Sequence, residues 1–316
     1  MEVIALDVGG TNTRIGLLGI KGNNIFLKEK KAYLTKNVTN IAKLINGFNK
    51  KVDNACIAIA GPIIGGKAKL TNGKLTIDLS KLKKDTKLKN IKLVNDFYAN
   101  AASLPFIKKS DVFVLNKGSK TNKNKMIIGP GTGLGKAYSL NSRVYPSEGG
   151  LTIIGIEDIE DYALIDYFKK KIRDIVYYED ILSGRGLSNI YEYLEINSNL
   201  LPDSKIRKII IDKKNKPELI TENYKKDKLS EMTIDIFVKF YARYTRDSAL
   251  NILCSEVYLA GGISNSLKEP MKKDFMKEFA MHRHYKNLLK KIGVSVITNS
   301  DIGLIGAGAI AAGLQQ

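Results

Sequence analysis

The stretch EVIALDVGGTNTRIGLL, residues 2–18, decides the fold. Residues 2–8 form a short apolar strand, two glycines with Thr11 and Asn12 follow, and apolar residues resume at once in residues 14–18. Because the turn is short, the pattern predicts strand, turn and strand, and not a strand that leads into a helix. Glycines let backbone N–H groups approach an anion closely, and Thr11 and Asn12 add side-chain donors. The turn is therefore a candidate phosphate-binding site.

Two more glycine turns follow short apolar strands, at residues 129–135 (GPGTGLG) and 260–264 (AGGIS). None of the three turns ends in the Gly-Lys-Ser/Thr of a Walker loop. A dinucleotide fingerprint is also absent, because the glycine spacing differs and a strand is expected after residue 135. Each turn taken singly is explained as an ordinary tight turn. The three together, in this order, indicate nucleotide binding.

Acidic residues stand beside these turns. Asp7 ends the first strand, where it would lie near a phosphate-bound Mg²⁺ and reach it through water. Asp96 follows the short strand 92–94, and a carboxylate there can accept a proton from an attacking hydroxyl. The residues alone leave a second interpretation open, in which Asn95 and Asp96 cap a helix that begins near residue 98. Glu148 and Glu179 could accept hydrogen bonds from ligand hydroxyls, or be surface acids.

The rest of the chain alternates strands and helices, which predicts an α/β protein. Residues 197–226 are polar and lysine-rich and are interpreted as an exposed connection. Strands are expected at 55–60, 92–94 and 256–260, and residues 125–140 are expected to form a strand, a glycine turn and a second strand. Helices are expected at 38–51, 158–173, 179–195, 232–253 and 303–314.

Composition limits the function. The 316 residues carry a net charge of +19, but only eight of the 51 basic residues are arginines and the lysines are dispersed. Recognition of base edges favours arginine, so a basic enzyme surface is preferred to a nucleic-acid partner. No apolar run approaches the roughly 20 residues that cross a bilayer. With two cysteines in apolar settings and an acid at position 2, we expect a cytoplasmic protein with reduced thiols and no membrane partner.

Cysteines and histidines are too few for a zinc cluster, since the chain has two of each. The pair in His282-Arg283-His284 could bind a metal, but it lies on a lysine-rich stretch that is interpreted as solvated surface.

Taken together, the glycine turns and acids resemble those of the bacterial-type glucokinases, in the superfamily of sugar kinases, chaperone ATPases and actin. The resemblance runs nearly end to end, from Leu6 to Gly308. Its recognisable blocks are 6–12 (LDVGGTN), 58–62 (AIAGP), 70–72 (LTN), 94–97 (VNDF), 129–135 (GPGTGLG), 147–150 (SEGG), 182–187 (LSGRGL), 259–262 (LAGG) and 305–308 (IGAG).

The resemblance implies the two-domain actin-like ATPase fold, which is ribonuclease H-like, with a cleft between a small α/β domain (1–97 plus about 300–316) and a large one (98–299). It also implies an ATP-dependent kinase of a hexose hydroxyl that uses Mg²⁺ and is often a homodimer. Asp96 would be the catalytic base and Asp7 would hold Mg²⁺, through water. The sugar would be bound by Asn72, Asn95, Glu148, Glu179 and Arg185, and ATP by Gly9, Gly10, Thr11, Asn12, Gly131, Thr132, Gly133, Gly261, Gly262 and Ile263.

Two departures from the family pattern concern the sugar. Leu151 stands where the family has a histidine that helps to bind it, and Arg185 replaces a proline within the 182–187 block. Loss of one polar partner can change the preference of a site by orders of magnitude. A sugar acid such as 2-keto-3-deoxygluconate is therefore an alternative substrate.

A rival from another class is a non-catalytic sugar sensor on the same fold, although a pure binder has no need of Asp96. The related group of repressors and kinases is a weaker match. Its repressors carry a DNA-binding domain before the residue that corresponds to Asp7, and only six residues precede Asp7 here. Its kinases commonly carry a cysteine-rich zinc loop, for which two cysteines are too few.

Overall fold

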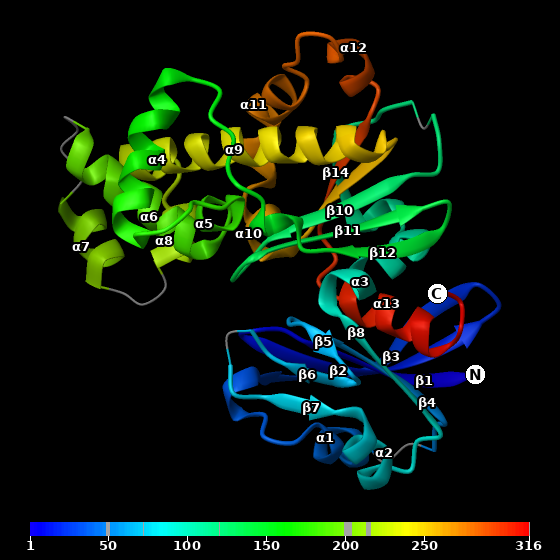
Figure 1. The fold of residues 1–316 in the computed structure, drawn as a ribbon. Coiled ribbons are helices and arrows are strands. Elements are labelled where there is room, and N and C mark those ends of the chain that lie inside the picture. The colour runs from blue at the N-terminus through cyan, green and yellow to red at the C-terminus, as the bar shows by residue number, and fades with distance from the viewer. Residues whose placement is uncertain (49–50, 72, 120, 199–203, 213–215, 316) are drawn as a thin grey trace. The chain divides into compact units, whose positions relative to one another are not determined.

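The structure, a computed structural model, describes residues 1–316 except 49–50, 72, 120, 199–203, 213–215 and 316 (Figure 1). The chain divides into two compact units. Unit 1 comprises residues 1–112, 137–146 and 299–316, and unit 2 comprises residues 113–136 and 147–298. The mixed α/β class expected from the sequence is confirmed, and the finer domain limits stay a prediction. No helix in the described ranges is long and apolar enough to cross a membrane.

Unit 1 is built on a five-stranded sheet with the order β3-β2-β1-β4-β8. β1 is antiparallel to β2 and parallel to β4, and β4 is parallel to β8. The opening stretch is thus the strand–turn–strand that its pattern predicts. The strands are β1 (Glu2–Val8), β2 (Asn12–Lys21), β3 (Asn24–Leu34), β4 (Asn54–Ile59) and β8 (Asn90–Asn95).

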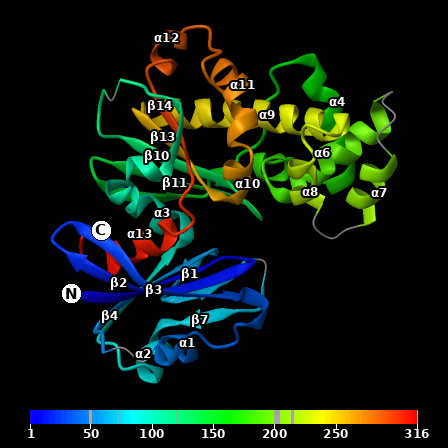
Figure 2. The same ribbon diagram turned by 180° about the vertical axis from the view of Figure 1, so that it is seen from behind.

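Alternation along β1 gives this sheet two apolar faces. Ile4, Leu6 and Val8 join the buried cluster that α1 and α2 complete, whereas Val3 and Ala5, also buried, face the other way. Figure 2 shows α3 and α13 on one side of the sheet and α1 and α2 on the other. The elements are α1 (Ile41–Gly47), α2 (Leu79–Asp85), α3 (Asp96–Ala102), α13 (Ile302–Ala311) and a small sheet of β5 (Ile63–Ile64), β6 (Lys67–Lys69) and β7 (Thr76–Asp78).

Helix α13 packs very closely on its neighbours in unit 1, and glycines make this approach feasible. A Cβ added at Gly306 would lie 1.7 Å from the carbonyl oxygen of Ala99 in α3, far inside contact distance. A Cβ at Gly303 would lie 2.9 Å from the carboxyl group of Asp7. The Gly- and Ala-rich tail is therefore a helix whose glycines are dictated by contact.

The second sheet has six strands in the order β12-β11-β10-β13-β14-β9. Its strands β10, β13 and β14, which lie in unit 2, run parallel. The strands are β9 (Val112–Asn116), β10 (Lys125–Pro130), β11 (Leu134–Leu140), β12 (Arg143–Ser147), β13 (Glu256–Leu259) and β14 (Gly293–Ile297).

Helices make up most of the remainder of unit 2. The longest, α9, buries the apolar stripe predicted from its spacing, with Phe237, Phe240 and Tyr244 among the buried residues. The helices are α4 (Ile159–Ile172), α5 (Tyr178–Ile181), α6 (Gly184–Asn197), α7 (Ser204–Asp212), α8 (Lys216–Glu222), α9 (Lys228–Ile252), α10 (Gly261–Ser266), α11 (Lys268–Phe279) and α12 (Lys286–Leu289).

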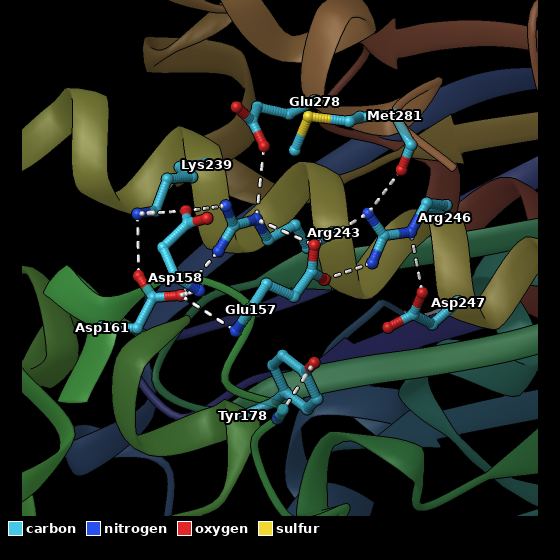
Figure 3. A network of polar contacts seen from close by, with 11 residues as sticks. Glu157, Asp158, Asp161, Tyr178, Lys239, Arg243, Arg246, Asp247, Glu278 and Met281 are labelled. Atoms are coloured by element: carbon cyan, nitrogen blue, oxygen red, sulfur yellow. Dashed lines mark hydrogen bonds and ion pairs between the residues drawn. The ribbon is translucent and has the colours of Figure 1, made fainter. Parts of the chain in front are cut away.

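Two arginines of α9 hold the start of α4 and the end of α11 (Figure 3). Arg243 is 1% exposed and pairs with Asp161 at 2.7 Å, with Asp158, and with Glu278 at 3.2 Å. Arg246 pairs with Glu157 and Asp247 and donates to the carbonyl of Met281. Removing one partner of such a buried network leaves an uncompensated charge, which is strongly destabilising. The network therefore fixes the helical layer of unit 2.

Two expectations from the sequence are wrong. The described parts of 197–226 are not an exposed connection, because they contain α7 and α8 and bury Ile210 and Ile220; residues 199–203 and 213–215 lie outside the described residues. The single helix expected at 179–195 is two helices, α5 and α6. They separate because Ser183 caps α6, accepting from the N–H of Gly186 at 3.2 Å. Gly186 itself has no room for a side chain beside the carbonyl of Ile181.

The glycine packing of α13 gives a stability prediction. We expect Gly306→Ala to lower the free energy of unfolding by about 3 kcal/mol, the upper end for overpacked sites, because backbone must move. Gly47→Ala, at the end of α1 where nothing lies within 4 Å, is the control; it should be neutral or stabilising by about 1 kcal/mol. Urea unfolding measures both. Equal stability of the two variants would contradict the packing argument.

Candidate functional site

The first glycine turn, in unit 1, is held by Thr35. The backbone N–H of Thr35 donates to the carbonyl of Thr11 at 2.8 Å, and its hydroxyl donates to the carbonyl of Gly9 at 2.8 Å. Within the turn the N–H of Gly9 donates to the carbonyl of Asn12 at 3.0 Å. Thr11 and Asn12 are exposed. The turn is thus rigid on one side and offers polar side chains on the other.

Asp7 lies on β1 just before this turn. Its carboxylate accepts a hydrogen bond from Arg14 at 3.3 Å and lies against Gly303 of α13. Burial raises the pKa of Asp7, and the charge and hydrogen bond of Arg14 oppose that shift. Asp7 is therefore a constrained carboxylate with one cationic neighbour, and sequence reasoning did not identify Arg14 as that neighbour.

Asn95 and Asp96 join β8 to α3. The side-chain oxygen of Asn95 accepts from the N–H groups of Phe97 at 2.9 Å and Tyr98 at 3.3 Å, so Asn95 caps the helix. Asp96 is the first helical residue and accepts from the N–H of Phe97 at 3.0 Å. The helix begins two residues before the position expected from the sequence, because this cap precedes Tyr98. The capping interpretation is confirmed for Asn95 and leaves a role for Asp96 open.

The strand register brings Asp96 and the first turn to the same edge of the sheet. Val8 is level with Ile59 on β4, and Ile59 is level with Asn95 on β8. Because the three strands are parallel, their carboxyl ends meet at one edge, where α/β proteins bind ligands. Two strand spacings separate the turn from Asn95, roughly 10 Å. Unit 1 thus assembles a carboxylate and a candidate phosphate turn within the reach of a sugar and a phosphoryl group.

The second glycine turn, in unit 2, is tied to Glu179 of α5. One carboxylate oxygen of Glu179 accepts from the N–H of Leu134 at 2.9 Å, and a Cβ at Gly133 would come within 2.5 Å of that oxygen. The carbonyl of Gly131 accepts from the N–H of Gly184, at the start of α6, at 2.9 Å. Glu179 is thus part of the frame of the turn and not an isolated surface acid.

The third turn lies beside the second. The N–H of Ala260 donates to the carbonyl of Ile128 on β10 at 2.8 Å. Gly261 adopts φ +91°, and a Cβ there would lie 3.0 Å from the carbonyl oxygen of Pro130. Open space surrounds the positions where Gly131 and Gly262 would carry side chains. The two turns of unit 2 therefore present adjacent backbone at the carboxyl ends of β10 and β13.

A buried lysine that sequence reasoning missed supports the Glu148 segment. Lys136 of β11 is 4% exposed, donates to the hydroxyl of Ser248 at 3.2 Å and lies over the Tyr244 ring at 5.0 Å from the centroid. A Cβ at Gly149 would lie 2.2 Å from its ammonium nitrogen. Burial lowers the pKa of Lys136 to about 8. A lysine within the strand LGKAYSL, directly after a glycine turn, was the signal available in the sequence.

The remaining residues predicted to contact the sugar differ in their exposure and in their partners. Glu148 is exposed at the start of the 3-10 turn Gly149–Leu151. Arg185 is 63% exposed and pairs with Asp180 at 3.0 Å, so its charge has a partner within unit 2. Asn72 lies outside the described residues. Gly10 lies in the first turn and Thr132 in the second, whereas Ile263 lies in helix α10, which begins at Gly261.

The fold, with glycine turns at the carboxyl ends of parallel strands in each unit, is that of the actin-like sugar kinases. Two solved structures share it. A glucokinase from an Antarctic psychrotroph has a TM-score of 0.82 at 23% identity, with 99% of each chain covered. The glucokinase from Balamuthia mandrillaris, in complex with glucose, has a TM-score of 0.78 at 22% identity, with 98% of this chain and 93% of that chain covered.

Sequence comparison identifies the family. The glucokinase family profile matches residues 4–314, so the chain belongs to the glucokinase family. A curated relative, the glucokinase of Trichormus variabilis, is 29% identical over 343 residues, with 99% of both proteins covered. The family expected from the sequence blocks is confirmed.

Lys136 gives a pH-dependent stability prediction. Its pKa is about 8 in the folded protein against 10.5 for an unperturbed lysine. Below pH 8 Lys136 is charged in both the folded and the unfolded state, and its burial destabilises the folded state. Between pH 8 and 10.5 the folded state has released the proton, whereas the unfolded state still holds it. The free energy of unfolding therefore rises with pH across this window. In wild type this rise in the free energy of unfolding should be about 3 kcal/mol, and it should be absent from Lys136→Met.

The measurement is urea unfolding of wild type and Lys136→Met at about pH 7 and about pH 10. Lys125→Met is the control, since Lys125 is partly exposed and paired with Glu256 at 3.1 Å. The stability difference between Lys136→Met and wild type should shrink at the higher pH. A difference that does not change with pH would show that the ammonium is not desolvated.

Proposed function

We propose that the chain transfers the γ-phosphoryl group of ATP to a hydroxyl of a hexose, with glucose as the first candidate and Asp96 as general base. Membership of the glucokinase family establishes the class of reaction, a sugar phosphotransferase. The observation that supports the role of Asp96 is its position at the edge of the unit 1 sheet that also carries the first glycine turn.

The residues of this edge suit proton transfer. Asp96 keeps its orientation because Oδ1 accepts from the backbone N–H of Phe97, and a carboxylate so fixed can accept the proton of an attacking hydroxyl. The side-chain oxygen of Asn95 is used in capping, so its amide nitrogen is proposed to donate to a sugar oxygen. Glu148 and Glu179 are proposed to accept hydrogen bonds from sugar hydroxyls, and Asn72 to add a further contact.

ATP phosphates are proposed to bind on the first two turns and adenosine near the third. Thr11 and Asn12 are exposed, and open space above Gly131 and Gly262 fits a close approach of phosphate or ribose to backbone. Bound Mg²⁺ would neutralise phosphate charge and is proposed to be held by Asp7 through water. The described residues contain no cluster of three metal-ligating side chains, so phosphate oxygens and water would complete its coordination.

A sugar acid is not favoured as the substrate. The curated relatives are named glucokinases. Arg185, the cation that suggested a carboxylated sugar, is largely exposed and is paired with Asp180. The sensor alternative is not favoured either, since the family is one of kinases. The homodimer and the cytoplasmic location stay predictions.

The role of Asp96 is tested by Asp96→Asn. This change keeps the oxygen that accepts from Phe97 and removes the base. We expect kcat for glucose to fall by about 10²–10⁴-fold, the usual scale of general-base catalysis, while glucose affinity changes little. Coupled ADP release measures kcat, and calorimetric titration measures glucose binding.

Asp85→Asn, an exposed change on α2, is the matched control and should retain full activity. If kcat of Asp96→Asn equals that of wild type, Asp96 is not the base. If wild type binds glucose but turns over no sugar, the sensor alternative replaces the kinase.

Substrate choice is tested separately by comparing kcat/KM for glucose and for 2-keto-3-deoxygluconate in wild type and Arg185→Ala. Because Asp180 already neutralises Arg185, we expect glucose to be preferred in both proteins and the ratio to change by less than about threefold. A wild-type preference for the sugar acid that Arg185→Ala abolishes would overturn this assignment.

A further inference from the structure

Helices α11 and α12 follow one another in unit 2 (Figure 1). A basic pocket lies at the end of α11 and around α12. Its volume is about 990 Å³, at the upper end of the range for small-molecule sites. No carboxylate of the described chain lines it. The lining residues are Asn116, Met276, Lys277, Ala280, Met281, His282, Arg283, Lys286 and Lys290.

The four lysine and arginine side chains of the pocket have no acidic partner in the described ranges. Lys277, Arg283, Lys286 and Lys290 form no ion pair there, whereas Lys272 on the same helix pairs with Glu269 at 3.1 Å. Four like charges around one concavity repel one another and create a strong positive potential. An anion bound there would relieve that repulsion.

The pocket also has fixed polar groups. Nδ1 of His282 accepts from the backbone N–H groups of His284 at 3.1 Å and Tyr285 at 3.0 Å, so the ring proton of the neutral imidazole is on Nε2, a donor. Asn116 donates to the carbonyls of Lys290 at 2.9 Å and Ile292 at 2.6 Å, which fixes the segment after α12 to β9. The wall of the pocket is thus hydrogen-bonded and not a chance grouping of mobile lysines.

The pocket lies away from the turns proposed to bind ATP. Lys290 and Ile292 precede β14, whereas the second and third turns follow the ends of β10 and β13. Because β10, β13 and β14 are parallel and in register, the pocket lies at the amino ends of these strands and the two turns lie at their carboxyl ends. The five residues of β14 alone span roughly 15 Å. The pocket is therefore a separate site.

We propose that this pocket binds a multiply phosphorylated small molecule. Four cations and an imidazole donor match several phosphate charges better than a single carboxylate. Met276, Ala280 and Met281 supply apolar surface for an uncharged part of the ligand. This binding goes beyond the kinase reaction and does not depend on it.

Residue-resolved lysine acylation, read by mass spectrometry, tests the proposal with inorganic tripolyphosphate as the probe. At a probe concentration about five times the Kd, acylation of Lys277, Lys286 and Lys290 should slow by roughly sixfold. Lys83 and Lys84 on α2 are the reference, since both are exposed and form no ion pair in the described chain. Parallel arms with ATP and with glucose 1,6-bisphosphate distinguish a nucleotide from a sugar bisphosphate as the source of the phosphates.

The double variant Lys286→Ala/Lys290→Ala should weaken protection of Lys277 by about tenfold in Kd, while Lys83→Ala/Lys84→Ala, which removes the same charge elsewhere, should not. Both should keep the wild-type kcat. The proposal is overturned if Lys83 and Lys84 are protected equally, if chloride at matched ionic strength gives the same protection, or if the pocket variant binds as wild type does.

Discussion

The close approach of α13 to the sheet and to α3 is the constraint on which unit 1 depends. Gly303 lies against the carboxylate of Asp7, and Gly306 against the carbonyl of Ala99. One helix thus sets the positions of β1, which carries the candidate metal-binding acid, and of α3, whose first residue is Asp96. Any side chain that separates α13 from these neighbours would move both Asp7 and Asp96. The packing of α13 therefore determines where the two candidate catalytic and metal-binding acids lie.

Sequence predicted those parts of the fold whose signals are local. The strands at residues 2–18 and the helix of residues 232–253 carry apolar patterns that tertiary contacts only reinforce. It failed at 197–226, where lysines on the solvent side hid the buried Ile210 and Ile220. It also failed to divide α5 from α6, because the division depends on the cap by Ser183 and on the close approach of Gly186 to the carbonyl of Ile181, which composition does not reveal.

In the candidate site, too, the features with local sequence signals could be predicted and those that depend on distant partners could not. Its chemistry-bearing residues follow glycine turns and strand ends, so their positions could be predicted from motifs. Their supporting contacts could not, because the partners are far apart in sequence, as with Leu134 and Glu179 or Lys136 and Ser248. The interpretation of Arg185 needed its partner too. A cation in a substrate block suggests an anionic substrate only until Asp180 is seen to neutralise it.

Lys136 is an example of a residue whose importance depends on partners that are distant in the sequence. Desolvation lowers its pKa and costs stability, while the Tyr244 ring and the Ser248 hydroxyl offset part of that cost. Its ammonium occupies the space that a side chain at Gly149 would need. The first glycine after Glu148 is therefore explained by a neighbouring lysine and not by its own backbone angles. Lys136 also donates to Ser248 of α9, the helix that Arg243 and Arg246 anchor, so this lysine links the segment of Glu148, a proposed sugar-binding residue, to the helical layer of unit 2.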